Sequence, residues 1–310
     1  MPSWQDLVRL YGTSGFDIDG LLERLTTELQ RIAALRDDRM VIYYGSAFLQ
    51  HPELPNIHLS IMPEDINGYM SCVHEMDFSK GLTLVLHTPG GSPNAAETIV
   101  KYLRSKFDDI EVIVPAYAMS AGTMVALAAD RVIMGRQSQL GPIDPQMRTA
   151  HGTVSAHAVI DQFVWAKAEV AEDPGTVSVW APVLAAHGPS LLSEAKNALN
   201  YGAALVTEWL EKWMFAGNQD ASNRALKVAN YLSDASQHGS HGRRVDREEA
   251  NQLGLVVEEL EQSQDLQDAV LTAYHAMTIL FENTGISKLI LSSTDRNWLK
   301  GRRPQDSATN

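Results

Sequence analysis

Two short turns rich in glycine, serine and alanine follow apolar segments of this chain, and both could bind a developing negative charge. The first, Thr88-Pro89-Gly90-Gly91-Ser92-Pro93, follows LTLVLH at 82–87. Paired glycines let a backbone N–H approach a bound group, and the helix expected over 94–107 would point its positive end at the same place. A tight strand-to-helix turn explains the same residues, so both interpretations stay open.

The second turn places a serine where it could act as a nucleophile. Tyr117-Ala118-Met119-Ser120-Ala121-Gly122-Thr123 follows IEVIVP at 110–115. A serine hydroxyl among small residues can attack a carbonyl, and the N–H groups after it can bind the resulting oxyanion. Taken alone, Ser120 is more simply an N-cap of the helix expected over 119–129. Because the two turns end successive strands, we expect them to converge on one point of a parallel sheet.

The elements around these turns alternate between strand and helix. Apolar runs at 82–87, 110–115 and 131–134 are typical of buried parallel strands joined by helices. A strand is also predicted at 39–48, and a helix at 63–76 with Glu64 and Asp65 in its first turn. Residues 1–38 are typical of helix. Beyond Pro145, the pattern predicts helices at 155–170, 190–214, 245–256 and 266–281, a polar loop at 233–244, a short apolar segment at 288–293 and a basic tail.

Composition narrows the class of protein. The 310 residues are 45% hydrophobic and 20% charged, which is typical of a globular chain. A net charge of −13 argues against a nucleic-acid or anionic-membrane partner. One cysteine, Cys72, excludes an internal disulfide and fits a reducing compartment. With no long apolar window and no basic-apolar leader at the start, we expect no membrane span and a cytoplasmic location.

Three segments together resemble a known family. LHTPGGSPNAAETIV, VPAYAMSAGTMVALAADRVIM and LGPIDPQ are similar to the serine dehydrogenase proteinases, which have the Clp protease/crotonase fold and are related to signal peptide peptidase A. HGRRVDREEANQLGLV resembles a closing segment of peptidases of this fold. The resemblance implies an α/β, Clp/crotonase-like ββα superhelix with a mostly parallel sheet. We expect three segments along the chain: a helical N-terminal extension at 1–38, the peptidase domain at 39–260, and a C-terminal helix and tail at 261–310.

The same resemblance implies a serine peptidase that needs no cofactor or metal and acts on a protein or peptide. Ser120 would be the nucleophile, and the N–H groups of Gly91 and Ala121 would form the oxyanion hole. Gly90 and Asp144 would contact substrate; Asp144 could instead orient a base, or simply cap the turn between two prolines. Proteins of this fold generally assemble, so a homo-oligomer is expected.

This interpretation does not decide which residue is the general base. Clp-type subunits carry a histidine about 25 residues after the serine, but residues 141–145 of this chain are GPIDP. Related signal peptide peptidases use a lysine, which must be neutral and therefore buried. Lys196, in LLSEAKNALN, has apolar sequence neighbours and is the favoured base. Lys167, close to Glu residues that would raise its pKa, and His241, in a loop resembling the family's, are the alternatives.

Two other classes of function remain open on the sequence. A crotonase-like acyl-CoA enzyme would use the same oxyanion hole without a nucleophile, and a non-catalytic scaffold would explain the missing histidine. His87 is expected to pack beside the glycine turn. His238 and His241 lack a third ligand at suitable spacing for zinc. The tryptophans are interpreted as helix-packing residues: Trp180, Trp209 and Trp213.

Overall fold

The computed structural model describes residues 3–11, 17–149, 152–186, 188 and 190–301. The chain forms two compact units, each described below by itself: unit 1 comprises residues 1–140 and 245–310, and unit 2 comprises residues 141–244. The three segments expected from the sequence divide the chain differently, because the described residues of both chain ends pack on the sheet of unit 1. No described helix is both long and apolar enough to cross a bilayer.

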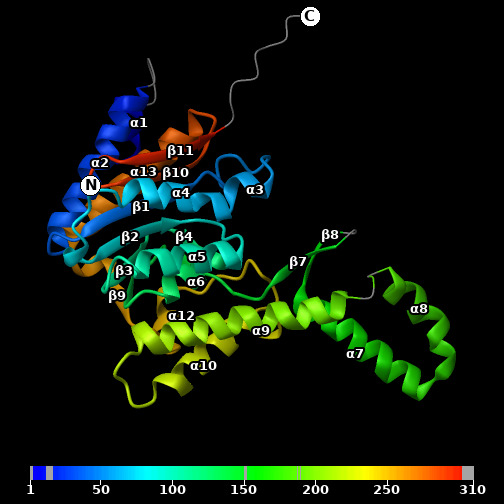
Figure 1. Ribbon diagram of the computed structural model, residues 1–310. Coiled ribbons are helices and arrows are strands. Elements are labelled where there is room, and N and C mark those ends of the chain that lie inside the picture. Colours follow the sequence, from blue (N-terminus) through cyan, green and yellow to red (C-terminus); the bar gives the residue numbers. More distant parts are fainter. Residues whose placement is uncertain (1–2, 12–16, 150–151, 187, 189, 302–310) are drawn as a thin grey trace, which may run out of the picture. The chain divides into compact units, whose positions relative to one another are not determined.

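A seven-stranded sheet forms the centre of unit 1, in the order β11-β10-β1-β2-β3-β5-β9. Five neighbouring strands are parallel, as the strand–helix alternation predicts: β1 (Met40–Ser46), β2 (Leu82–His87), β3 (Ile110–Val114), β5 (Arg131–Met134) and β9 (Val257–Glu259). Two antiparallel strands, β10 (Ile286–Ser292) and β11 (Asn297–Gly301), extend the edge beside β1. Part of the expected basic tail is therefore a strand (Figure 1).

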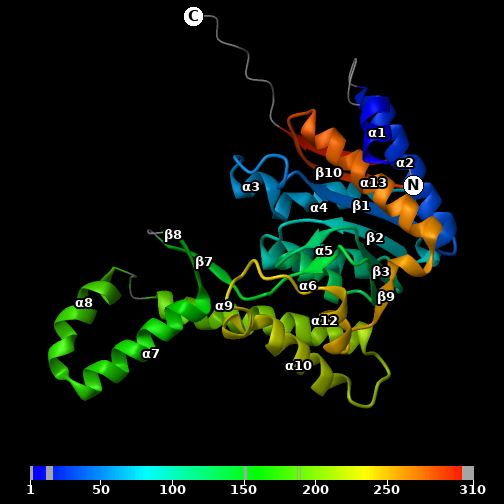
Figure 2. The same cartoon turned by 180° about the vertical axis from the view of Figure 1, so that it is seen from behind.

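Helices cover both faces of this sheet, so its five inner strands, β10, β1, β2, β3 and β5, are buried on both sides. Val85 and Ile113 join the core under α2 (Ile18–Leu35) and α13 (Gln264–Glu282), which lie in front of the sheet in Figure 2. Leu84 and Val112 point the other way, toward α5 (Pro93–Arg104) and α6 (Ala121–Leu127). This alternation is the period of two that strands impose on side chains. The parallel pairing of five neighbouring strands, with helices on both faces, confirms a mostly parallel α/β fold.

Shorter elements complete unit 1. Helix α1 (Trp4–Tyr11) packs on α13, and α4 (Ile66–Cys72) packs on β10 and β11. A second, two-stranded parallel sheet pairs β4 with β6. The remaining elements are β4 (Tyr117–Ala118), β6 (Gln139–Leu140), α3 (Asn56–Leu59), α12 (Arg247–Gln252) and the 3-10 turns Pro63–Asp65, Phe78–Lys80 and Leu260–Gln262.

Unit 2 is mainly helical. An antiparallel hairpin of β7 (Gln146–Thr149) and β8 (Gly152–Ser155) leads into α7 (Ala156–Glu172). The predicted break at Asp173 is a capped 3-10 turn, Pro174–Thr176, followed by α8 (Val177–Ala185). The long predicted helix is α9 (Leu191–Trp209) with a π-helical turn, Leu210–Met214. It packs on α7 and on α10 (Ala221–Ser233), and α11 (Ala235–His238) follows in the predicted loop.

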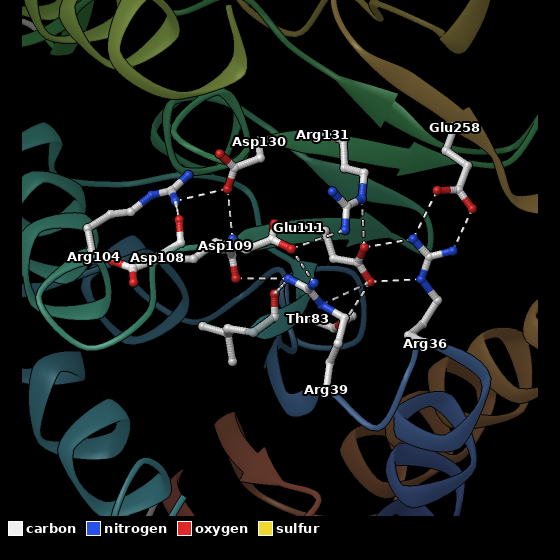
Figure 3. A network of polar contacts seen from close by, with 12 residues as sticks. Arg36, Arg39, Thr83, Arg104, Asp108, Asp109, Glu111, Asp130, Arg131 and Glu258 are labelled. Atoms are coloured by element: carbon white, nitrogen blue, oxygen red, sulfur yellow. Dashed lines mark hydrogen bonds and ion pairs between the residues drawn. The ribbon is translucent and has the colours of Figure 1, made fainter. Parts of the chain in front are cut away.

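Charged side chains gather at the amino ends of the parallel strands (Figure 3). Glu111, in β3, is fully buried and accepts hydrogen bonds from Arg36, Arg131 and Thr83. Arg36 also binds Glu258 of β9. Each charge in this cluster has an opposite charge beside it, so the cluster joins five segments without leaving a buried charge unpaired.

Candidate active site

The two glycine- and serine-rich turns meet at the carboxyl ends of β2 and β3, as the parallel sheet predicts. Backbone bonds join them directly: the Thr88 N–H donates to the Tyr117 carbonyl at 2.9 Å, and the Met119 N–H donates to the Thr88 carbonyl at 3.1 Å. Gly90 has φ +101°, and a Cβ placed on it would lie 2.7 Å from the Ser120 Cβ. Only a glycine allows this approach, so Gly90 brings the first turn against Ser120.

Ser120 has a strained backbone and an unused hydroxyl. Its φ of 51° and ψ of −116° lie outside the regions that residues with a Cβ normally occupy. It precedes α6 but its side chain caps none of the helix N–H groups, so the simple N-cap interpretation does not hold. Within the described residues of unit 1, its Oγ has no hydrogen-bond partner. A strained serine with a free hydroxyl is the form that a nucleophile takes at a strand-to-helix turn.

Gly91 is held from its other side by the segment around Ile61. The Ile61 N–H donates to the Gly90 carbonyl at 2.7 Å, and the Ser92 N–H donates to the Ile61 carbonyl at 2.9 Å. These bonds lie on either side of Gly91, whose φ is +152°. Among the described residues of unit 1, the N–H groups of Gly91 and Ala121 have no acceptor. Two free N–H donors beside Ser120 are what an oxyanion hole requires.

His87 lies inside an aromatic cluster under this loop, as the sequence suggested. Its ring centroid is 5.1 Å from that of Phe48, 5.0 Å from that of Tyr274 and 5.9 Å from that of Tyr117. Burial lowers the pKa of His87 to about 3. The imidazole is therefore neutral at physiological pH and packs at the end of β2.

Unit 2 contains a histidine–carboxylate pair. The Nδ1 of His241 lies 2.6 Å from an oxygen of Asp144, which is only 2% exposed. The second oxygen of Asp144 accepts a hydrogen bond from the Gln146 side chain at 2.7 Å. Both oxygens thus bind side chains, and Asp144 does more than cap a turn. Because a carboxylate only accepts, this contact selects the neutral tautomer in which Nδ1 carries the proton and Nε2 has the lone pair.

The two candidate lysines lie elsewhere in unit 2, and the expected burial of Lys196 is wrong. Lys196 and Lys167 are both exposed. They line an apolar groove of about 610 Å³ between α7, α8 and α9. Leu191 and Ala195 are buried, but Lys196 is the next residue round the helix and points away from that stripe. The environment that would make Lys196 neutral is absent.

The structure also shows the surroundings of His238 and of the three tryptophans interpreted above. The His238 ring binds the Tyr231 carbonyl at 2.8 Å. Trp209 is buried, and its ring centroid lies 6.4 Å from that of Trp213 with the two rings tilted by 35°. Trp180 lines the groove and donates a hydrogen bond to Glu169. Among the described residues, no group of three or more histidine, cysteine or acidic side chains is arranged to hold a metal ion.

Comparison with known proteins finds a matching family. Residues 56–179 match the model of a family described as ClpP-like SDH-type serine proteinase. The resemblance to this proteinase family is confirmed. The matched segment contains Gly90, Gly91, Ser120, Ala121 and Asp144 but ends before Lys196 and His241.

Two uncharacterized proteins of Methanocaldococcus jannaschii are related to this chain. One is 30% identical over 202 residues, which is 65% of this chain, and the other is 32% identical over 123 residues, which is 40% of it. The matched segments span 62% and 40% of the lengths of these relatives.

Two solved structures resemble the structure of this chain at low sequence identity. A variant of the 1510-N membrane-bound stomatin-specific protease has 17% identity and a TM-score of 0.40, covering 64% of this chain and 74% of that one. ClpP1 from Listeria monocytogenes has 13% identity and a TM-score of 0.38, covering 80% and 99%. Likeness at this level says nothing about mechanism.

Sequence reasoning missed the support of the glycine turn. The Ile61 backbone forms hydrogen bonds with Gly90 and Ser92, on either side of Gly91, but no recognisable motif marks Ile61 in the sequence. Asp65, interpreted as a first-turn acid, is fully buried and paired with Lys288 of β10. A lysine within the apolar segment 288–293 was the available signal, because a lysine inside a buried strand requires a buried partner.

Proposed function

We propose that this protein is a serine peptidase in which Ser120 forms an acyl-enzyme with its substrate. The observation that carries the proposal is the meeting of the two turns, which leaves a strained serine beside two N–H donors with no acceptor. The family match of residues 56–179 supports the same reaction class. No feature of the site specifically favours acyl-CoA chemistry or a scaffold role.

In the first step, Ser120 Oγ attacks the substrate carbonyl, and the oxyanion is bound by the N–H groups of Gly91 and Ala121. Such a donor is typically worth about 10²–10³ in rate. Gly90 would lie against the bound segment. Collapse of this oxyanion intermediate breaks the peptide C–N bond, and the proton that the general base took from Ser120 passes to the amine, which leaves as the first product. Water then gives a proton to the base and attacks the acyl-enzyme ester, which releases the acid as the second product and returns the proton to Ser120.

We assign the general base to His241, oriented by Asp144, in place of Lys196. The 2.6 Å contact fixes the protonated nitrogen of the ring and leaves Nε2 as the proton acceptor. Asp144 also stabilises the imidazolium that forms. Lys196 and Lys167 are exposed and lack the burial that a neutral lysine needs.

Reaction with a fluorophosphonate probe tests these roles. We expect the wild type to be labelled at Ser120 and the Ser120→Ala variant to be unlabelled. His241→Gln should slow labelling by about 10³-fold or more, because the base is lost. Labelling is followed by mass spectrometry of the modified peptide, and circular dichroism checks that each variant is folded.

Two control variants separate the candidate bases. His157→Gln changes a histidine of the same unit whose ring binds the Ser233 carbonyl, and it should label at the wild-type rate. Lys196→Met should also be unaffected. Loss of labelling in Lys196→Met with full labelling in His241→Gln would return the role to the lysine.

The proposal includes a protein or peptide substrate, a cytoplasmic location and assembly into a homo-oligomer. Helix α13 buries its apolar face in its own unit, so we do not propose it as the assembly surface. Helices α7 and α8 instead expose Trp165, Val177 and Val179. Light scattering should give a multiple of 34.1 kDa. Trp165→Glu should lower that mass; a monomeric wild type would contradict this part of the proposal.

A further inference from the structure

A completely buried ion pair lies behind the glycine turn. Lys288 of β10 and Asp65 are both 0% exposed, and the lysine Nζ is 2.5 Å from an oxygen of the carboxylate. The other oxygen of Asp65 accepts from the Tyr44 hydroxyl at 2.9 Å and from the Met62 N–H at 3.0 Å. Burying two charges is costly, and apolar residues of the same volume would often serve stability as well. The pair therefore calls for a role other than stability.

The pair and its neighbours hold one short backbone segment, residues 59–62. The Lys288 Nζ donates to the Ser60 carbonyl at 3.1 Å, and the Ser46 hydroxyl donates to the Leu59 carbonyl at 2.6 Å. On the other side of Ile61, the Asp65 carboxylate accepts a hydrogen bond from the Met62 N–H. Buried side chains thus fix the backbone on both sides of Ile61.

Ile61 in turn fixes the glycine turn. Its N–H and carbonyl bind Gly90 and Ser92, the residues before and after Gly91. A side chain on Gly91 would lie 2.3 Å from the Ile61 carbonyl oxygen, so the two backbones are in direct contact. The direction of the Gly91 N–H therefore depends on where the segment 59–62 lies.

We propose that Lys288 and Asp65 are positioning residues for the oxyanion hole, acting through Ile61 on the Gly91 N–H. Neither side chain touches substrate. The inference rests on the proposed peptidase function, because it gives the buried pair a role in the rate of acylation. A displacement of one ångström at a reacting centre can cost about a hundredfold in rate, so a small movement of Ile61 is sufficient.

The test measures labelling of Ser120 by the fluorophosphonate probe at several probe concentrations. The phosphonyl oxygen of the probe occupies the oxyanion position, so the maximal labelling rate reports the hole, and the half-saturating concentration reports binding. We expect Asp65→Asn to lower the maximal rate by about tenfold to a hundredfold with little change in half-saturation. Glu111→Gln is the matched control: it replaces another fully buried carboxylate by an amide, at the opposite end of the sheet.

A second variant covers the case in which Asp65→Asn does not fold. The double variant Lys288→Met, Asp65→Asn buries no charge, yet it lacks the lysine donor to the Ser60 carbonyl. It should fold and still label slowly. Wild-type rates in either folded variant, or an equal loss in Glu111→Gln, would overturn the inference and leave the peptidase proposal standing. A wild type unlabelled at Ser120 would overturn both.

Discussion

The amino and carboxyl ends of the parallel strands in unit 1 are built in opposite ways. At the amino end, charged side chains from distant segments pair with one another: Arg36, Arg39, Glu111, Arg131 and Glu258 (Figure 3). Burial opposes ionisation of Glu111, but hydrogen bonds from Arg36 and Thr83 outweigh it and hold the pKa of this carboxyl below its usual value. The result is an ionised, fully satisfied group that ties the sheet together.

At the carboxyl end, the backbone makes the contacts and part of it is left unsatisfied. Gly90 and Gly91 have positive φ, Ser120 is strained, and the N–H groups of Gly91 and Ala121 lack acceptors within the described residues of unit 1. Unsatisfied donors and backbone strain reduce stability, and they persist where a site needs them. One end of the strands therefore serves the fold, and the other serves the chemistry.

The largest effect on stability is expected at the amino end. Glu111→Gln removes the buried charge that Arg36, Arg39 and Arg131 share, and leaves these partly buried guanidinium groups with Glu258 and Asp109 alone. We expect it to lower the free energy of unfolding by about 3–5 kcal/mol, measured by urea denaturation. The Ser120 labelling rate should stay within about twofold of wild type when both proteins are assayed about 10–15 °C below the variant's midpoint temperature. Both proteins are folded at that temperature, so the comparison reports the site and not the loss of stability.

A surface pair gives the control for that prediction. Glu97 binds Lys101 one helical turn away at 2.6 Å, on the outside of α5. Glu97→Gln should cost less than about 1 kcal/mol. Equal losses in the two variants would mean that the buried cluster is no more important for the fold than a surface ion pair, and the contrast between the two ends would fail.

A smaller loss of stability is expected at the carboxyl end from Gly91→Ala. A Cβ there would meet the Ile61 backbone at 2.3 Å, and φ is +152°. We expect a loss of about 2–3 kcal/mol in unfolding free energy, together with a fall in the labelling rate. Gly217→Ala is the control, because Gly217 has φ +76° with nothing within 4 Å of an added Cβ; strain alone should cost about 1 kcal/mol. A Gly91→Ala variant with wild-type stability and labelling would show that Ile61 does not hold this turn.

The contrast between the ends also explains what the sequence could predict. The turns at 88–93 and 117–123 carry their information locally, in glycine, serine and small residues after apolar runs, so the strands and their meeting point were predictable. The amino-end cluster was not, because Arg36, Glu111 and Glu258 are far apart in sequence and only the fold brings them together. The sequence also did not predict strand β11, because this short segment is a strand through its pairing with β10 and not through a local pattern of its own.

The general base shows where sequence neighbours mislead. Lys196 has apolar residues on both sides in the sequence, but a helix turns 100° per residue, and its neighbours in the buried stripe are Leu191, Ala195 and Leu199. His241 and Asp144 are separated by 97 residues, and no local pattern joins them. Apolar neighbours in sequence therefore predict burial of a helical residue only at spacings of three or four.

The smallest expected change in stability, and the sharpest test of the contrast, is Ser120→Gly. Glycine adopts positive φ without the steric cost that Ser120 bears at 51°, so the variant should relieve strain at the carboxyl end. The greater freedom of glycine in the unfolded chain offsets part of this gain. We therefore expect unfolding free energy to rise by about 0.5–1 kcal/mol in urea denaturation, while fluorophosphonate labelling is lost. Ser120→Ala keeps the Cβ and the strain, so it should be equally unreactive but no more stable than wild type. If Ser120→Gly is less stable than Ser120→Ala, the turn is not strained by its serine, and the carboxyl end does not give up stability for its chemistry.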